Sequence, residues 1–217
     1  MSPSNRTQSW WTTIESKLRH RTSLLFEKLI GVDFSRTLDT MDLGYDNSIV
    51  IRSSPSGNHY LSSLLDDLPI RAGDNILDIG CGKGSAMRML LRYPFSTVDG
   101  LELAPEIAAV AERNLARLRL HRAHIFNVNA IDFDLYQKYN FFYMYHPFPN
   151  SVMAPVIEAI KIARSMQAET IIIYTNPVCH ALIEAAGFSK LRVYPDQWGN
   201  GMFVYSNRPD SGRGFRR

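Results

Sequence analysis

Short apolar runs alternate along most of this chain with longer segments in which apolar residues recur at helical spacing. Short runs of this kind predict buried strands, and the longer segments predict amphipathic helices. The predicted strands occupy residues 76–79, 97–102, 124–129, 141–146 and 170–176. The predicted helices that alternate with them occupy residues 84–92, 105–118, 151–165 and 178–186.

The last two apolar runs, 190–195 and 202–206, are separated only by a turn that contains Gly, Asn and Asp. So short a connection joins antiparallel strands, because a parallel crossover needs roughly a dozen residues or more. Five strands alternating with helices and closed by this hairpin predict an α/β fold. We expect a doubly wound, mostly parallel seven-stranded sheet with an antiparallel last strand and helices on both faces.

We expect residues 1–70 to form an extension ahead of a main domain at 71–207. Apolar residues recur at helical spacing over 10–30, whereas 31–58 contain the glycines and the proline of a connector. Residues 59–68 predict a short amphipathic helix. The helix over 10–30 either packs on the main domain or forms a lid over an active site.

With 217 residues, of which 45% are hydrophobic and 21% charged, the chain has the composition of one globular domain. It contains no run of the roughly 18 apolar residues that cross a bilayer, and residues 1–13 lack the apolar core of a secretory signal. Two cysteines predict a reduced, cytoplasmic compartment and no disulfide framework. The net charge is +3, and the basic end, 208–217, predicts a disordered, solvated tail, with a binding arm as the alternative.

The first predicted strand runs directly into a glycine-rich turn that opens a helix. The turn reads Asp78-x-Gly80-x-Gly82-x-Gly84. Strand, glycine turn and helix in this order build a ligand site at the carboxyl edge of a sheet, and we expect Asp78 to face the same crevice. A dinucleotide fingerprint does not fit, because Ser85 or Met87 stands where its third glycine or alanine belongs.

The motif that begins at Asp78 resembles the first motif of the class I S-adenosylmethionine-dependent methyltransferases. Residues 100–111, with Glu102 at the end of the second strand, resemble the second motif of that family. Where the family usually has an acid beside the adenine, this chain has Asn129. Residues 145–150, Tyr-His-Pro-Phe-Pro-Asn, lie where many members carry a Pro-Phe motif. The resemblance covers about residues 60–207, and it implies a methyltransferase that uses S-adenosylmethionine.

The resemblance also implies a role for each matched residue. Asp78 and the glycine backbone would hold the methionine moiety of the cofactor. Glu102 would accept hydrogen bonds from the ribose hydroxyls, and Asn129 with its two neighbours would contact the adenine. The implied cofactor-binding residues are Asp78, Gly80, Cys81, Gly82, Gly84, Glu102, Leu103, Asn129, Ala130, Ile131 and His146. The catalytic candidates are His146, whose neutral imidazole would take a proton from the acceptor, and Tyr145.

The same residues also have purely structural interpretations. Gly84 would serve helix–strand packing, and Asp78 would cap a helix. Asn129 would close a turn. Cys81 would fill space in the glycine turn, with no basic partner to make it a nucleophile. His146 would be a hydrogen-bonded loop residue.

Two other classes of protein compete with a methyltransferase. A nicotinamide-dependent oxidoreductase shares the ribose-binding acid, but Ser85 and the closing hairpin disfavour it. A binding or scaffold protein would keep the fold without catalysis. We expect the methyl acceptor to be an oxygen or nitrogen atom on a small molecule or a protein side chain, because no long basic stripe or RNA-reading motif supports a nucleic-acid partner. We expect no metal site and no membrane partner, and the oligomeric state stays open.

Overall fold

The structure is a computed structural model that describes residues 21–36, 56–164, 169–197 and 199–209. The start of the predicted N-terminal helix, most of the connector and the end of the basic tail lie outside these residues. Residues 21–30 are helical, in agreement with the apolar spacing. Among the described helices, none is long and apolar enough to cross a membrane.

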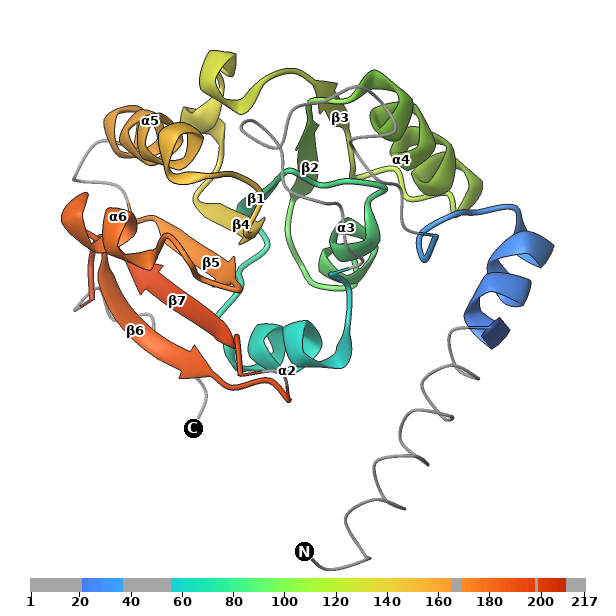
Figure 1. Ribbon diagram of the computed structural model, residues 1–217, viewed down its shortest axis with the longest axis horizontal. Coiled ribbons are helices and arrows are strands. Elements are labelled where there is room, and N and C mark those ends of the chain that lie inside the picture. The colour runs from blue at the N-terminus through green and yellow to red at the C-terminus, as the bar shows by residue number, and fades with distance from the viewer. Residues whose placement is uncertain (1–20, 37–55, 165–168, 198, 210–217) are drawn as a thin grey trace, which may run out of the picture.

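One seven-stranded sheet forms the centre of the molecule, with the strand order β3-β2-β1-β4-β5-β7-β6 (Figure 1). Strands β1 to β5 are parallel, and β7 lies antiparallel to both β5 and β6. This arrangement confirms the predicted fold class. The strands are β1 (Asn75–Ile79), β2 (Thr97–Glu102), β3 (Ile125–Asn127), β4 (Phe141–Tyr145), β5 (Ile171–Thr175), β6 (Ser189–Tyr194) and β7 (Met202–Ser206).

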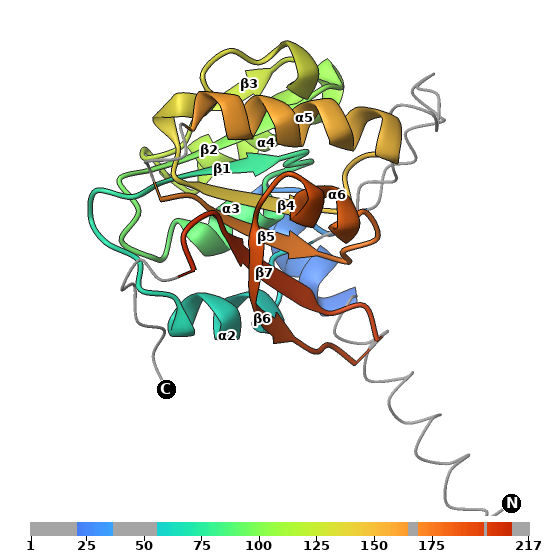
Figure 2. The ribbon, with the colours of Figure 1, turned by 90° about the vertical axis from the view of Figure 1, so that its left-hand side faces the viewer.

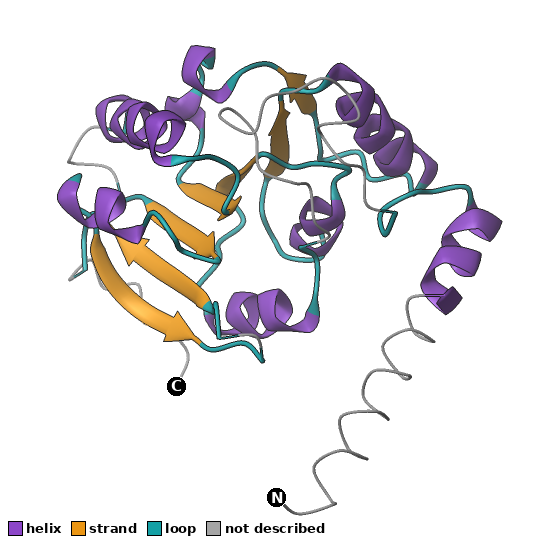
Figure 3. Cartoon of the chain, viewed as in Figure 1, coloured by secondary structure: helices purple, strands orange, loops and turns teal. Residues whose placement is uncertain are grey.

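Helices cover both faces of the sheet, as Figures 2 and 3 show. One face carries α2 (His59–Asp67), α3 (Ser85–Leu90) and α4 (Pro105–Arg117), whose apolar residues form one core cluster with the strands. The other face carries α5 (Asn150–Ala163), α6 (His180–Ala185) and two short 3₁₀ helices, η2 (Ala130–Asp132) and η3 (Tyr136–Lys138). Because α2 contributes to the first core, the helix ahead of the glycine turn packs on the sheet itself.

Alternation along the strands decides which side chains meet at the carboxyl edge of the sheet. In β1, Ile76 lies in the core under α3 and α4, whereas Leu77 and Ile79 lie in the opposite core. Asp78 therefore faces the α3 side, since successive side chains of a strand point to opposite faces. The same alternation in β2 directs Glu102 to that side. Parallel neighbours end at one edge, so the two acids belong to one site.

Most element boundaries shift by one or two residues from the predicted ones, and two of these shifts lie at the carboxyl edge of the sheet. Strand β3 ends at Asn127, two residues early, because Asn129 caps η2 and turns the chain away from the sheet. Strand β4 ends at Tyr145, since His146 adopts a left-handed backbone with φ of 35°. Neither deviation is visible in the apolar pattern. The two 3₁₀ helices were likewise not predicted.

Candidate functional site

The glycine turn after β1 is held against the end of β2 by backbone hydrogen bonds. The N–H groups of Gly80 and Cys81 both donate to the carbonyl of Leu101, at 3.0 and 2.9 Å. Gly80 has a φ of +76°, and a Cβ there would lie 2.7 Å from Cβ of Pro147. A side chain at this position would therefore be strained and would also collide with the loop after β4. The close approach brings the His-Pro loop directly onto the glycine turn.

Glu102 ties the end of β2 to this turn. One carboxylate oxygen, Oε2, accepts a hydrogen bond from the N–H of Gly82 at 3.0 Å, and Oε1 accepts one from the N–H of Ala104 at 2.9 Å. The side chain is buried, and burial raises the pKa of its carboxyl while the backbone donors oppose that rise. Each oxygen retains a further lone pair for a ligand hydroxyl.

Asp78 is a buried acid without a complete set of partners. Only 2% of the residue is exposed, and its Oδ2 atom has no hydrogen-bond partner among the described residues. Burial, and then the nearby charge of Glu102, raise the pKa of Asp78 well above its usual value. Buried polar atoms are normally hydrogen-bonded, so an unpaired one is a position where a ligand group fits. A cationic group would suit this acid best.

Cys81 lies inside the turn and packs under β2. A Cβ on Gly100 would lie 2.7 Å from its Sγ atom, and the thiol is buried. Burial raises the pKa of Cys81 well above its usual value, with smaller contributions from Asp78 and Glu102. The thiol is therefore an unreactive packing group, which favours the space-filling interpretation.

The segment expected beside the adenine lies at the end of β3. The Oδ1 atom of Asn129 accepts a hydrogen bond from the N–H of Ile131 at 3.1 Å, so this side chain does close a turn. Ala130 is buried, and Ile131 is 42% exposed. Asn127 donates from Nδ2 to the carbonyls of Glu102 and Leu103, each at 2.9 Å, and thereby fixes the loop after β2.

His146 lies at the end of β4, next to the glycine turn. Its Nδ1 atom is 3.2 Å from the hydroxyl of Tyr174, which also accepts a hydrogen bond from the N–H of Cys179 at 3.3 Å. Burial lowers the pKa of His146 below its usual value, so the imidazole is neutral at pH 7. Tyr145 is half-buried, and burial together with the charge of Asp196 raises the pKa of its phenol.

The structure places the residues singled out from the sequence at the ends of strands β1 to β4 or in the segments that follow them. It also adds residues that sequence reasoning missed. Tyr174 on β5 contacts His146, and Asn127 fixes the loop after β2. Asn127 stands in the segment already matched to the family, so its amide could have been noticed. No local pattern marks Tyr174. Among the described residues, no cluster of metal-binding side chains is present.

The sheet order and the antiparallel β7 give this chain a fold that is shared with solved S-adenosylmethionine-dependent methyltransferases. A solved S-adenosylmethionine-dependent methyltransferase from Aquifex aeolicus superposes with a TM-score of 0.54 and 16% sequence identity, over 68% of this chain and 88% of that one. Residues 77–169 match the family model described as a methyltransferase domain. The matched segment runs from the first strand of the sheet to just before the fifth, so it includes the glycine turn and the end of β2.

Two curated relatives match shorter stretches. A trans-aconitate 2-methyltransferase from Methylobacterium nodulans is 32% identical over 69 residues, which are 31% of this chain and 27% of that protein. A malonyl-[acyl-carrier protein] O-methyltransferase from Halalkalibacterium halodurans is 40% identical over 62 residues, or 27% of this chain and 23% of that protein. The matches span only about a quarter of these relatives. A nicotinamide-dependent oxidoreductase is not favoured by any of these findings.

Proposed function

We propose that this protein transfers a methyl group from S-adenosylmethionine to an oxygen or nitrogen atom of a small molecule or of a protein side chain. The observation that carries the proposal is the buried acid pair, Asp78 and Glu102, at a glycine turn on which the loop after β4 directly lies. The acid pair supplies a donor site, and the loop with His146 supplies an acceptor side next to it.

The residues fit the cofactor in two respects. The unpaired Oδ2 of Asp78 suits the ammonium group of a methionine moiety. Glu102, already oriented by two backbone N–H groups, suits the ribose hydroxyls. The remaining residues assigned to the donor are Cys81, Gly82, Gly84, Leu103, Asn129, Ala130, Ile131 and His146.

When bound, S-adenosylmethionine supplies a methyl group on a positively charged sulfonium. The protein then needs mainly to align the acceptor with that methyl group and to exclude water. His146 would hold the acceptor and take its proton, and its lowered pKa keeps the imidazole in the base form at neutral pH. For Nε2 to accept a proton, Nδ1 must carry the hydrogen and donate it to the oxygen of Tyr174. Tyr145 is the second candidate for contact with the acceptor.

The proposal also includes the domain boundaries, the cellular compartment and the first acceptor atom to test. We assign residues 1–70 to an extension, 71–207 to the methyltransferase domain and 208–217 to a tail. We place the protein in the cytoplasm, because both of its cysteines are free and buried. One relative is named an O-methyltransferase, so oxygen acceptors should be tested first.

Calorimetric titration and a transfer assay test the proposal together. Purified protein is titrated with S-adenosylmethionine and, separately, with NAD, and labelled methyl transfer is then followed into fractionated cell extract. We expect saturable binding of S-adenosylmethionine alone and label in a small-molecule or protein fraction. Binding that Glu102→Ala abolishes, without transfer to any fraction, would instead indicate a non-catalytic binding protein. Binding of NAD alone would refute the proposal.

A further inference from the structure

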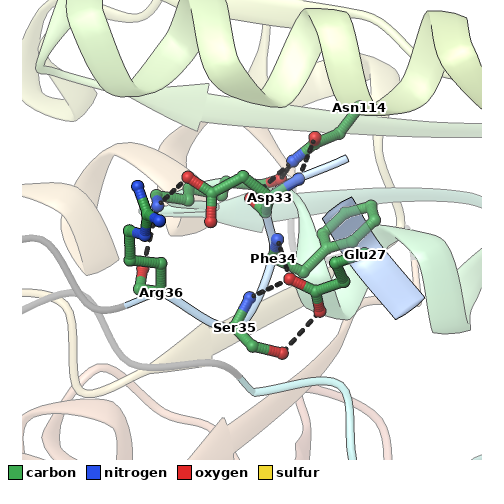
Figure 4. A network of polar contacts seen from close by, with 7 residues as sticks. Glu27, Asp33, Phe34, Ser35, Arg36 and Asn114 are labelled. Atoms are coloured by element: carbon green, nitrogen blue, oxygen red, sulfur yellow. Dashed lines mark hydrogen bonds and ion pairs between the residues drawn. The ribbon is translucent and has the colours of Figure 1, made fainter. Parts of the chain in front are cut away.

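Residues 31–36, a segment distant from the glycine turn in the sequence, contact that turn through Asn114 and Lys83. Figure 4 shows the polar network around this segment, with Glu27, Asp33 and Asn114 labelled. The link is Asn114 of α4, of which only 2% is exposed. Its Oδ1 accepts a hydrogen bond from the N–H of Asp33 at 2.8 Å, and its Nδ2 donates to the carbonyl of Asp33 at 2.8 Å. The same Nδ2 donates to the carbonyl of Lys83, within the glycine turn, at 3.0 Å. One buried amide therefore joins the segment and the turn.

An ion pair makes a second connection between the same two segments. The ammonium of Lys83 lies 2.7 Å from Oδ2 of Asp33 and 2.8 Å from the carbonyl oxygen of Arg36. The Lys83 side chain is only 5% exposed, whereas that of Asp33 is 38% exposed. A buried ammonium that loses its carboxylate is strongly destabilised, because the charge is left uncompensated away from water. Loss of the Asp33 carboxylate should therefore cost more stability than loss of a partner in a fully exposed ion pair.

Residues 31–36 are themselves fixed in place. Phe34 is buried and lies 4.8 Å beneath the guanidinium of Arg88 on α3. Glu27, buried on the helical residues 21–30, accepts hydrogen bonds from the N–H groups of Phe34 and Ser35 at 3.0 and 2.9 Å. The segment is therefore a preformed element with contacts to α3, α4 and the turn.

From this geometry we infer that residues 31–36 are a clamp that positions the glycine turn for S-adenosylmethionine. Glu102 holds the turn through the N–H of Gly82, and Asn114 holds it through the carbonyl of the next residue, Lys83. With both residues held, the turn keeps the conformation that the donor requires. Asp33, Lys83 and Asn114 are positioning residues in this scheme.

The inference rests on the proposed function, and it has a thermodynamic consequence. If the clamp favours the turn conformation that binds the donor, the donor must favour the docked clamp by the same free energy. Binding of S-adenosylmethionine should therefore slow amide exchange in residues 31–36. A segment that only adds stability to the fold would be protected no more than the other amides that exchange through global unfolding.

The test compares Asp33→Asn, Asp33→Glu and wild type in the full chain. Asp33→Asn removes the charge that faces Lys83, and we expect the dissociation constant for S-adenosylmethionine to rise at least about fivefold, the lower end of usual coupling between sites. We also expect faster exchange of the Gly82 and Gly84 amides without ligand. Asp33→Glu keeps a carboxylate and should restore most of the affinity. Glu158→Gln, which removes the exposed partner of Lys161 on α5, is the matched control and should change neither quantity.

A lowered melting temperature of Asp33→Asn with unchanged affinity would assign the ion pair to stability alone and overturn the inference. The inference would also be overturned if the Gly82 and Gly84 amides exchanged at the same rate in Asp33→Asn as in wild type. If wild type does not bind S-adenosylmethionine at all, the proposed function fails and the role of the clamp in donor binding fails with it. The exchange measurement then still reports whether the clamp holds the turn, so the two failures are distinguishable.

Discussion

Replacing Asp78 with asparagine should stabilise the fold and impair donor binding at the same time. The carboxyl is buried, its Oδ2 atom has no partner among the described residues, and Glu102 places a second acid nearby. Asp78→Asn keeps the size of the side chain and removes its ability to carry a negative charge. Function and stability are then in conflict at this one position, as is common where a site is prepared for a ligand.

The sign follows from the raised pKa of Asp78. The folded protein holds the proton to a higher pH than the unfolded chain does, so wild type loses stability as the pH rises toward the folded pKa. Asp78→Asn should keep its stability over this pH range, because an amide does not lose a proton. Between the unfolded and the folded pKa, wild type loses up to about 1.4 kcal/mol of stability per pH unit, and 1 kcal/mol shifts the melting temperature by roughly 2–4 °C in a protein of this length. We therefore expect the melting temperature of the variant, relative to wild type, to rise by up to roughly 3–5 °C per pH unit in that range.

The assay is thermal unfolding of both proteins from pH 5 to pH 9, with and without S-adenosylmethionine. Without ligand, the difference in melting temperature should grow with pH. With ligand, wild type should gain stability and Asp78→Asn should gain little, because loss of a charge-assisted hydrogen bond of 1.5–3 kcal/mol weakens binding roughly 10- to 100-fold. Glu158→Gln, which removes an exposed acid, controls for surface charge. A variant less stable than wild type at pH 9, or a difference independent of pH, would refute the reasoning.

Three further changes test other parts of the site. Gly80→Ala should destabilise the fold by about 2–5 kcal/mol, because left-handed strain and overpacking against Pro147 add up; Gly187→Ala, with a φ of +95° and nothing within 4 Å, should show the strain alone in the same denaturation series. Glu102→Gln should weaken donor binding in calorimetry by roughly tenfold or more, since one backbone N–H loses its acceptor; unchanged affinity would remove Glu102 from the donor site. In wild type, the rate of methyl transfer should rise with pH, with a midpoint below the usual pKa of histidine, and His146→Ala should abolish this rise. A pH profile identical to wild type would exclude His146 as the base.

The placement of Asp78 and Glu102 at one edge of the sheet was largely predictable from the sequence. Asp78 and Glu102 each end a strand that the apolar pattern marks clearly, and parallel neighbours β1 and β2 bring such residues to one edge and one face. The pattern could not show that Asn129 caps η2 or that β3 stops at Asn127, because side-chain capping competes locally with strand extension. The short element boundaries were therefore the least predictable part of this region.

Contacts between distant segments could not be predicted at all. Asn114 and Asp33 are 81 positions apart, and neither stands in a recognisable motif. The sequence pattern assigns Asn114 to a helix, but it does not reveal that a buried amide will join two loops. Tyr174 reaches His146 only because β5 pairs with β4 in one register. Such pairs depend on the three-dimensional packing of whole elements, which local periodicity does not encode.

The backbone conformation of the residues that follow β4 and β5 could not be predicted from the sequence either. His146 and Asn176 follow the adjacent strands β4 and β5, both have positive φ values, of 35° and 50°, and both precede a proline. A residue before proline is restricted, and a left-handed conformation there persists only where the surrounding structure enforces it. Here the N–H of His146 donates to the carbonyl of Thr175, and that of Asn176 donates to Gly201. The backbone at the ends of β4 and β5 is thus shaped by enforced geometry. The acids and glycines after β1 and β2 follow a recognisable sequence motif, whereas this geometry depends on hydrogen bonds between segments that no motif marks.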